Sequence, residues 1–98
     1  MRTREEVLGQ LQERREVTRR LGVRRLGLFG SVARNQGGAE SDLDFVVEFT
    51  RNTFDAYMDL KFLLEDLFQC RVDLVLVDAI KPRLRDPIVK ETVYVSGL

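Results

Sequence analysis

Two aspartates, Asp42 and Asp44, stand two residues apart in a segment that otherwise alternates between apolar and polar side chains. In an extended strand such residues project from the same face, where their like charges repel each other. A divalent cation offsets that repulsion, and Mg²⁺ prefers carboxylate oxygens supplemented by water and substrate phosphates. The pair therefore indicates metal-assisted chemistry on a phosphorylated substrate. The alternative is an exposed strand face that carries two solvated acids.

A third acid, Asp73, is predicted to lie beside this pair. A strand over residues 42–49, a helix over 54–68 and a strand over 72–77 form a β-α-β crossover, which makes the two strands parallel neighbours. The apolar residues of both strands share the face covered by the helix, so all three carboxylates fall on the open face. The alternative for Asp73 is a strand-entry residue in the turn after Arg71.

A candidate phosphate-binding turn precedes the aspartates. Gly30 and Ser31 follow a predicted strand over residues 23–29 and begin a short helical segment, where free backbone N–H groups and the helix dipole favour an anion. Arg34, one helical turn further on, could reach the same phosphates. If the first strand ends where the second begins, the two are antiparallel and this turn lies next to the aspartate pair. An ordinary turn and a solvated arginine are the alternatives.

Composition narrows the chemistry further. The chain has no histidine and one cysteine, which excludes Ser-His-Asp catalysis, Cys-His catalysis and Cys/His zinc sites. Carboxylates are left as the metal ligands and general bases. Sixteen basic residues balance sixteen acidic ones, which argues against a chain built to coat nucleic acid, although residues 1–25 are rich in arginine.

The hydrophobic period predicts the elements that must hold this site. Val7, Leu11, Val17 and Leu21 mark the buried side of a first helix, which Thr3 and Glu6 would cap. In order, we expect a helix over 4–21, strand 23–29, a helical turn over 31–34, a loop over 35–38, strand 42–49, helix 54–68, strand 72–77, a helix over 83–91 interrupted or restarted at Asp86-Pro87, and an edge strand over 92–95.

Two apolar faces matter for the packing. Phe54, Tyr57 and Leu60 begin the apolar side of helix 54–68, and Thr53 can cap that helix. Phe45 belongs to the buried face of strand 42–49.

The whole chain is expected to form one domain. Its 98 residues, 44% of them hydrophobic, suit a single α+β core over 1–98, with a small mixed sheet and helices on one face. No stretch approaches the ~18 apolar residues of a membrane span, and the N-terminus lacks a signal-peptide pattern. We therefore expect a cytoplasmic protein without a membrane partner.

Taken together, three spaced motifs resemble those of the DNA polymerase β-like nucleotidyltransferases. They are Gly30-Ser31-Val32-Ala33-Arg34, Ser41-Asp42-Leu43-Asp44 and Val72-Asp73-Leu74-Val75. The pattern is most similar to the minimal nucleotidyltransferase (MNT) antitoxins that pair with HEPN-domain toxins, and the likeness covers nearly the whole chain. Asn35 stands where that branch commonly has glycine; asparagine tolerates the left-handed conformation.

The resemblance implies a mechanism. Asp42 and Asp44 would be ligands of two Mg²⁺ ions, and Asp73 would be a ligand of the catalytic ion and the activator of the attacking hydroxyl. Gly30 and Ser31 would hold the β- and γ-phosphates of ATP. Pyrophosphate would leave as AMP moves to the acceptor.

The resemblance also implies the acceptor, a tyrosine of a HEPN ribonuclease toxin that is silenced by adenylylation. The arginine-rich first helix could dock that partner, although such helices are usually solvated. A second hypothesis is a non-catalytic antitoxin that neutralises the toxin by binding it. A third, polymerisation of nucleic acid, is disfavoured by zero net charge and the lack of room for a template-binding domain.

Overall fold

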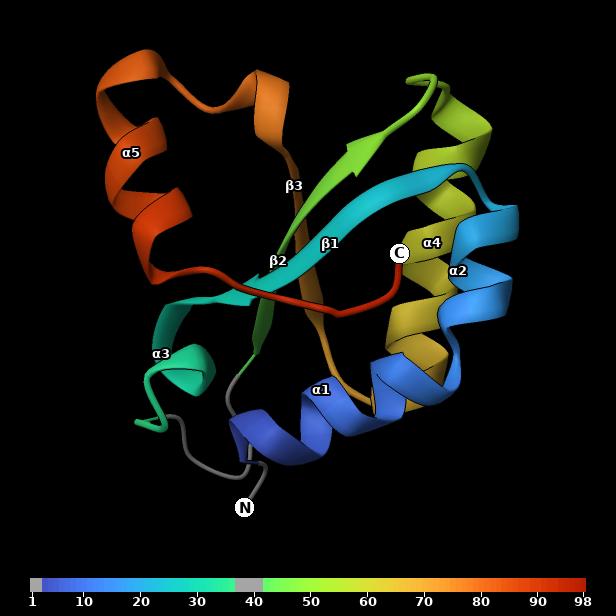
Figure 1. Ribbon diagram of the computed structural model, residues 1–98, viewed down its shortest axis with the longest axis horizontal. Coiled ribbons are helices and arrows are strands. Elements are labelled where there is room, and N and C mark those ends of the chain that lie inside the picture. The colour runs from blue at the N-terminus through green and yellow to red at the C-terminus, as the bar shows by residue number, and fades with distance from the viewer. Residues whose placement is uncertain (1–2, 37–41) are drawn as a thin grey trace.

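The computed structural model describes residues 3–36 and 42–98 as a four-stranded sheet with helices around it (Figure 1). The strand order is β3-β2-β1-β4, with β2 and β3 parallel and the other neighbouring pairs antiparallel. This is the mixed sheet of an α+β fold that the sequence predicts. In chain order the elements are α1 (Arg4–Glu13), α2 (Arg15–Arg20), β1 (Val23–Phe29), α3 (Gly30–Ala33), β2 (Leu43–Phe49), α4 (Phe54–Phe68), β3 (Val72–Leu76), a 3₁₀ turn η1 (Val77–Ala79), α5 (Pro82–Glu91) and β4 (Val93–Tyr94).

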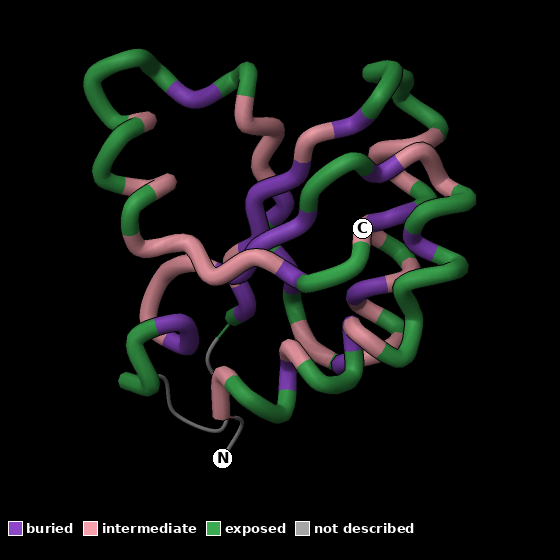
Figure 2. Tube along the Cα trace, viewed as in Figure 1, coloured by how far each residue is buried: buried purple, intermediate pink, exposed green. Residues whose placement is uncertain are grey.

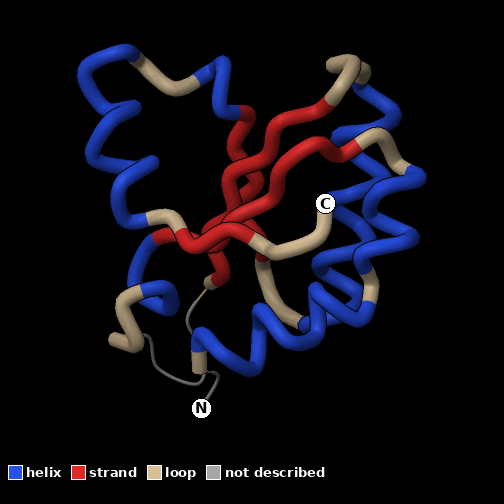
Figure 3. Tube along the Cα trace, in the orientation of Figure 1, coloured by secondary structure: helices blue, strands red, loops and turns tan. Residues whose placement is uncertain are grey.

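The core lies between one face of the sheet and the helices α1 and α4. Figure 3 shows the strands crossing the centre with helices outside them, and Figure 2 shows the buried trace concentrated there. Phe45 of β2 is fully buried and stacks on Phe68 of α4, with ring centroids 6.0 Å apart. The predicted buried face of β2 is thus confirmed. Val46, on the opposite face, is buried as well, opposite Gly27 of β1.

Helix α4 begins where its sequence predicts. The Thr53 side chain accepts a hydrogen bond from the Ala56 backbone N–H at 3.1 Å, which satisfies one of the free donors of the first turn. Gln69 ends the helix with a left-handed φ of 51°. Phe54 departs from the prediction because it is 77% exposed. As the first residue of α4 it reaches past the packed layer and lines a shallow hollow with Tyr57.

The predicted single helix over residues 4–21 is wrong, because the chain breaks at Arg14 into α1 and α2. The Arg14 N–H bonds to the Leu11 carbonyl in a tighter, 3₁₀-type turn at 3.0 Å, and the Thr18 hydroxyl bonds back to the Arg14 carbonyl at 2.9 Å. The break changes which residues face inward. Thr18 is buried, while Val17, predicted to be on the apolar side, is 44% exposed.

The C-terminal segment forms a continuous helix rather than an interrupted one. Pro87 lies inside α5. Proline removes one N–H, whose acceptor would be the carbonyl of the exposed Arg83, where water can replace it. The predicted edge strand is confirmed as β4, which pairs with β1 at Gly27 and Leu28.

The loop predicted over 35–38 is described only at its start. Asn35 has a φ of 56°, so the left-handed conformation expected of asparagine is confirmed. Gly37 and Gly38, together with Ser41 of the second motif, lie outside the described residues.

Candidate active site

The parallel pairing of β2 and β3 brings two of the predicted aspartates level with each other. Asp44, the second residue of β2, is in register with Asp73, the second residue of β3, and on its other side it is in register with Phe29 of β1. Asp42 is exposed and directly precedes β2. The structure thus places Asp42, Asp44 and Asp73 at one end of the sheet, where the strand β1 ends.

Asp44 is an aspartate of this group whose pKa is raised by its surroundings. Burial raises the pKa of its carboxyl from 3.8 to about 6, with further contributions from the Asp73 charge and from a hydrogen bond with Asp73. The charges of Asp42 and Glu91 raise the pKa of Asp44 further. The charged form of Asp44 is therefore disfavoured relative to a solvated aspartate, and a cation placed here would stabilise it.

Gly30 packs directly on Asp44. Its φ is 81°, a left-handed conformation that L side chains rarely adopt, and an added Cβ would lie 2.2 Å from Oδ2 of Asp44. Only glycine fits at this point. The turn is therefore in contact with the acidic cluster, as predicted from the antiparallel pairing of β1 and β2.

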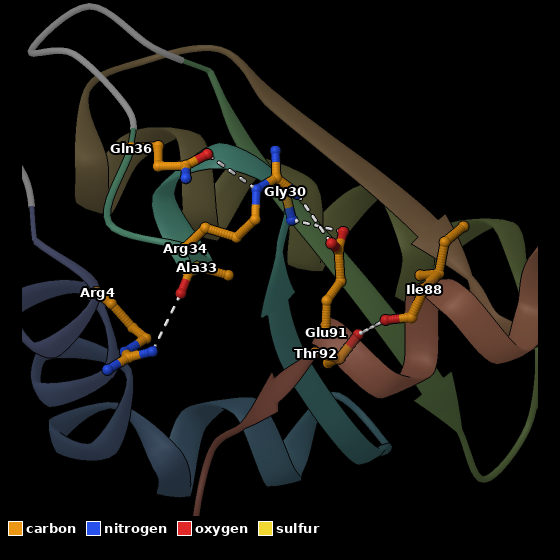
Figure 4. A network of polar contacts seen from close by, with 8 residues as sticks. All are labelled: Arg4, Gly30, Ala33, Arg34, Gln36, Ile88, Glu91 and Thr92. Atoms are coloured by element: carbon orange, nitrogen blue, oxygen red, sulfur yellow. Dashed lines mark hydrogen bonds and ion pairs between the residues drawn. The ribbon is translucent and has the colours of Figure 1, made fainter.

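The other two predicted phosphate-binding residues lie on or beside α3. Ser31 is half-buried and follows Gly30 directly, while Arg34 is exposed and ends the helix. The Arg34 Nε donates a hydrogen bond to the Gln36 side chain at 3.2 Å (Figure 4).

A residue that the sequence did not single out, Glu91, joins this group. Its Oε1 accepts a hydrogen bond from the Gly30 backbone N–H at 3.2 Å, and its Oε2 forms an ion pair with Nη1 of Arg34 at 2.8 Å (Figure 4). The available signal was weak: an acid in the last turn of α5 is unfavourable with respect to the helix dipole, so it needs another partner.

The first helix also contacts the site region. The Arg4 guanidinium donates to the Ala33 carbonyl at 3.2 Å (Figure 4). The Arg4 backbone N–H donates to the Asn35 side chain at 3.0 Å. These bonds satisfy groups at the end of α3 and attach α1 to the turn that follows it.

The ligand chemistry of the acidic cluster suits Mg²⁺. All three candidate ligands are carboxylates. Burial and then the charges of neighbouring carboxylates raise the pKa of Asp44, and a divalent cation would stabilise its charged form against both. Within residues 3–36 and 42–98, no three acidic or cysteine side chains are gathered as closely as around a bound ion. Mg²⁺ is commonly held by one or two carboxylates together with water and substrate phosphates, so a complete protein cage is unnecessary.

Comparison with known proteins defines the class to which this fold and site belong. The chain matches the nucleotidyltransferase domain family over residues 10–95. A solved structure of a minimal nucleotidyltransferase, 38% identical, superposes with a TM-score of 0.73 over 88% of this chain and 93% of that one. A toxin–antitoxin complex with AMP-PNP has the same fold, with a TM-score of 0.69 over 89% of this chain and 73% of that chain, at 21% identity.

The chain belongs to the nucleotidyltransferase domain family, and it is a nucleotidyltransferase of the minimal, MntA-like type. It is 35% identical to the protein adenylyltransferase MntA of Thermococcus cleftensis over 83 residues, which are 84% of each chain. A relative from Methanocaldococcus jannaschii, assigned to the same activity, is 33% identical over 98 residues, covering 97% of this chain and all of the relative.

The helices of the described residues are all too short or too polar to cross a membrane.

Proposed function

We propose that this protein transfers AMP from ATP to a tyrosine hydroxyl of a cognate HEPN-domain ribonuclease toxin and so acts as its antitoxin. The observation that carries the proposal is the register of Asp44 with Asp73 beside the Gly30 turn, in a chain whose relatives include a protein adenylyltransferase. A solved neighbour described as a tri-AMPylated HEPN toxin with its MNT antitoxin, from Shewanella oneidensis, has the same fold. Because the proposed reaction consumes ATP, we place this protein in the cytoplasm.

Each candidate residue has a distinct task in this proposal. Asp42, Asp44 and Asp73 would hold Mg²⁺, two ions in all, and the metal would neutralise charge on the phosphates and on the leaving pyrophosphate. The β- and γ-phosphates would be bound by the Gly30 N–H, Ser31 and the Arg34 guanidinium. These contacts would orient the triphosphate of ATP for in-line attack at its α-phosphorus.

The transfer itself needs one base. The acceptor oxygen forms a bond to the α-phosphorus, the bond from that phosphorus to the bridging β-phosphate oxygen breaks, and pyrophosphate departs. The Asp73 carboxylate is exposed at the edge of the cluster and would accept the proton of the acceptor hydroxyl. We treat residues 1–98 as a single nucleotidyltransferase domain, with the acceptor presented by the partner.

The test is transfer of label to the toxin. The protein is incubated with Mg²⁺, ATP labelled at the α-phosphate, and a cognate HEPN-domain toxin. The toxin peptides are then searched for labelled tyrosine. We expect label with the wild type and at least a ~100-fold loss with Asp42→Asn/Asp44→Asn, because the two principal metal ligands are gone. The matched control is Asp55→Asn/Asp59→Asn, which removes two charges from the exposed surface of α4 and should change nothing.

The competing function is a non-catalytic antitoxin that blocks the toxin by binding alone. In that case the toxin would be inhibited equally by the wild type and by Asp42→Asn/Asp44→Asn, and no labelled tyrosine would be found. That pair of results would contradict the enzymatic proposal.

A further inference from the structure

Glu91 accepts the hydrogen bonds of two groups that a nucleotide's phosphates would need. Its two carboxylate oxygens take the Gly30 N–H and one nitrogen of the Arg34 guanidinium, at 3.2 and 2.8 Å (Figure 4). The same groups are the phosphate donors of the proposed function, on which this inference rests. A carboxylate and a phosphate are both anions with oxygen acceptors, so they suit the same donors.

The Gly30 N–H and the Arg34 guanidinium differ in whether they can bind Glu91 and a phosphate at the same time. Gly30 has a single backbone N–H, which cannot point at Glu91 and at a phosphate oxygen with good geometry at once. Arg34 has five N–H donors, so it could bind a phosphate while keeping one contact to Glu91. Displacement of Glu91 from Gly30 is therefore the minimum that phosphate binding requires.

The negative charge of Glu91 also opposes the binding of phosphate. The carboxylate is near enough to the acidic cluster to raise the pKa of Asp44. A negative charge at that position also repels an incoming phosphate chain. Contact geometry and charge both oppose the binding of the triphosphate.

We propose that Glu91 is an internal competitor for the phosphate donors, and that a nucleotide must displace its carboxylate to bind. Glu91 thereby sets the affinity of the site for polyphosphate. The alternative is that Glu91 is a positioning residue, which holds Arg34 and the Gly30 turn in the conformation that binds phosphate. A positioning contact would leave the single Gly30 N–H free for the ligand, whereas here Glu91 occupies it.

The first experiment compares variants. Inorganic pyrophosphate with Mg²⁺ is titrated into ¹⁵N-labelled protein, and the dissociation constant is read from the Gly30 amide resonance. For Glu91→Gln we expect binding about threefold to tenfold tighter than in the wild type, because one partly exposed charge and its ion pair are removed. The neutral amide oxygen of glutamine is a weaker acceptor for the Gly30 N–H than a carboxylate, so a phosphate displaces it more easily. The matched control is Glu16→Gln, which takes the same charge from the Arg19 ion pair on α2 and should leave binding unchanged.

The second measurement needs no substitution. In the wild type, the ¹³C resonance of the Glu91 carboxyl should move as pyrophosphate saturates the site, because the carboxylate loses its donors. An unmoved resonance at saturation, or a Glu91→Gln protein that binds pyrophosphate no tighter than the wild type, overturns the inference and leaves the proposed function intact. If neither protein binds pyrophosphate, there is no phosphate site here, and the proposed function fails with the inference.

Discussion

At the scale of single residues, the absence of a Cβ at Gly30 allows this turn to lie directly against the Asp44 carboxylate. Gly30 lies against the Asp44 carboxylate, and its left-handed φ means that both its backbone conformation and the space around it exclude a side chain. The same residue offers its N–H to the region where phosphates are proposed to bind. A change of one methyl group at this position therefore affects stability and chemistry together.

Gly30→Ala should lower the free energy of unfolding by about 1–2 kcal/mol, because alanine is strained at this φ, and the displaced Asp44 carboxylate should weaken nucleotide transfer as well. The measurement is chemical denaturation together with the transfer assay. Gly9→Ala is the matched control. Apart from the neighbouring helix backbone, no atom lies within 4 Å of its added Cβ, and in the α1 interior alanine should stabilise by up to about 1 kcal/mol. Equal effects of the two substitutions would contradict the account of Gly30.

Asp44 should make the metal-free protein's stability depend on pH in a defined direction. The pKa of its carboxyl is about 6 in the folded protein, against 3.8 for an unperturbed aspartate side chain. Above about pH 6 the carboxyl is charged in both the folded and the unfolded state, and its burial and repulsion destabilise the fold fully. Between about pH 6 and pH 4 the folded protein takes up the proton first, so stability rises as the pH falls through this window.

The measurement compares the wild type with Asp44→Asn, which cannot titrate at this position. Without metal, the variant should exceed the wild type in unfolding free energy by more at about pH 7.5 than at about pH 4.5. Saturating Mg²⁺ at the higher pH should reduce that difference, because the cation offsets the repulsion. A difference that is constant with pH, or larger in acid, would mean that the Asp44 pKa is not raised.

At the scale of elements, β2 supplies both the site and the core. Asp44 and Phe45 are adjacent, so alternation along the strand sends one side chain to the acidic cluster and the next into the packed layer against Phe68 of α4. The position of the carboxylate therefore depends on the anchoring of β2 by its buried face.

Phe45→Ala should reduce the free energy of unfolding by about 3–5 kcal/mol, since a fully buried, stacked ring is removed and leaves a cavity. Whatever fraction stays folded should keep its chemistry, because Phe45 faces away from the aspartates. Phe54→Ala, at a position that is 77% exposed, is the control and should change stability little. Comparable losses for the two phenylalanines, measured by urea denaturation, would show that the buried face of β2 is assigned incorrectly.

The elements show what sequence patterns can and cannot predict. Period-two alternation and a β-α-β crossover were enough to predict the parallel pairing that brings Asp44 level with Asp73, because both signals are local and strong. The break at Arg14 was missed because Thr18 replaces an apolar residue on the buried side, and its hydroxyl bond to the backbone carries no hydrophobic signal. Glu91 was missed because its partners lie about sixty residues away in the chain.

At the scale of the whole molecule, the first and the last helix of the described residues, α1 and α5, both contact α3. Arg4, at the start of α1, donates to the Ala33 carbonyl, and Glu91, at the end of α5, accepts from the Gly30 N–H. After α5, β4 returns along β1, where the Val95 N–H donates to the Leu26 carbonyl at 2.8 Å. The turn that is proposed to bind phosphate is therefore held by elements from the whole length of the fold, although its own helix has only four residues.

Asp42, which directly precedes β2, Asp44 of β2 and Asp73 of β3 are proposed to hold a divalent metal jointly beside this turn. The most direct measurement is a crystal structure with Mn²⁺ and a non-hydrolysable ATP analogue, in which anomalous scattering locates the metal. We expect metal density in contact with Asp42, Asp44 and Asp73, and the β- and γ-phosphates against Gly30, Ser31 and Arg34. Metal density elsewhere, or a nucleotide bound with these carboxylates turned away from it, would contradict a shared metal site at these three aspartates.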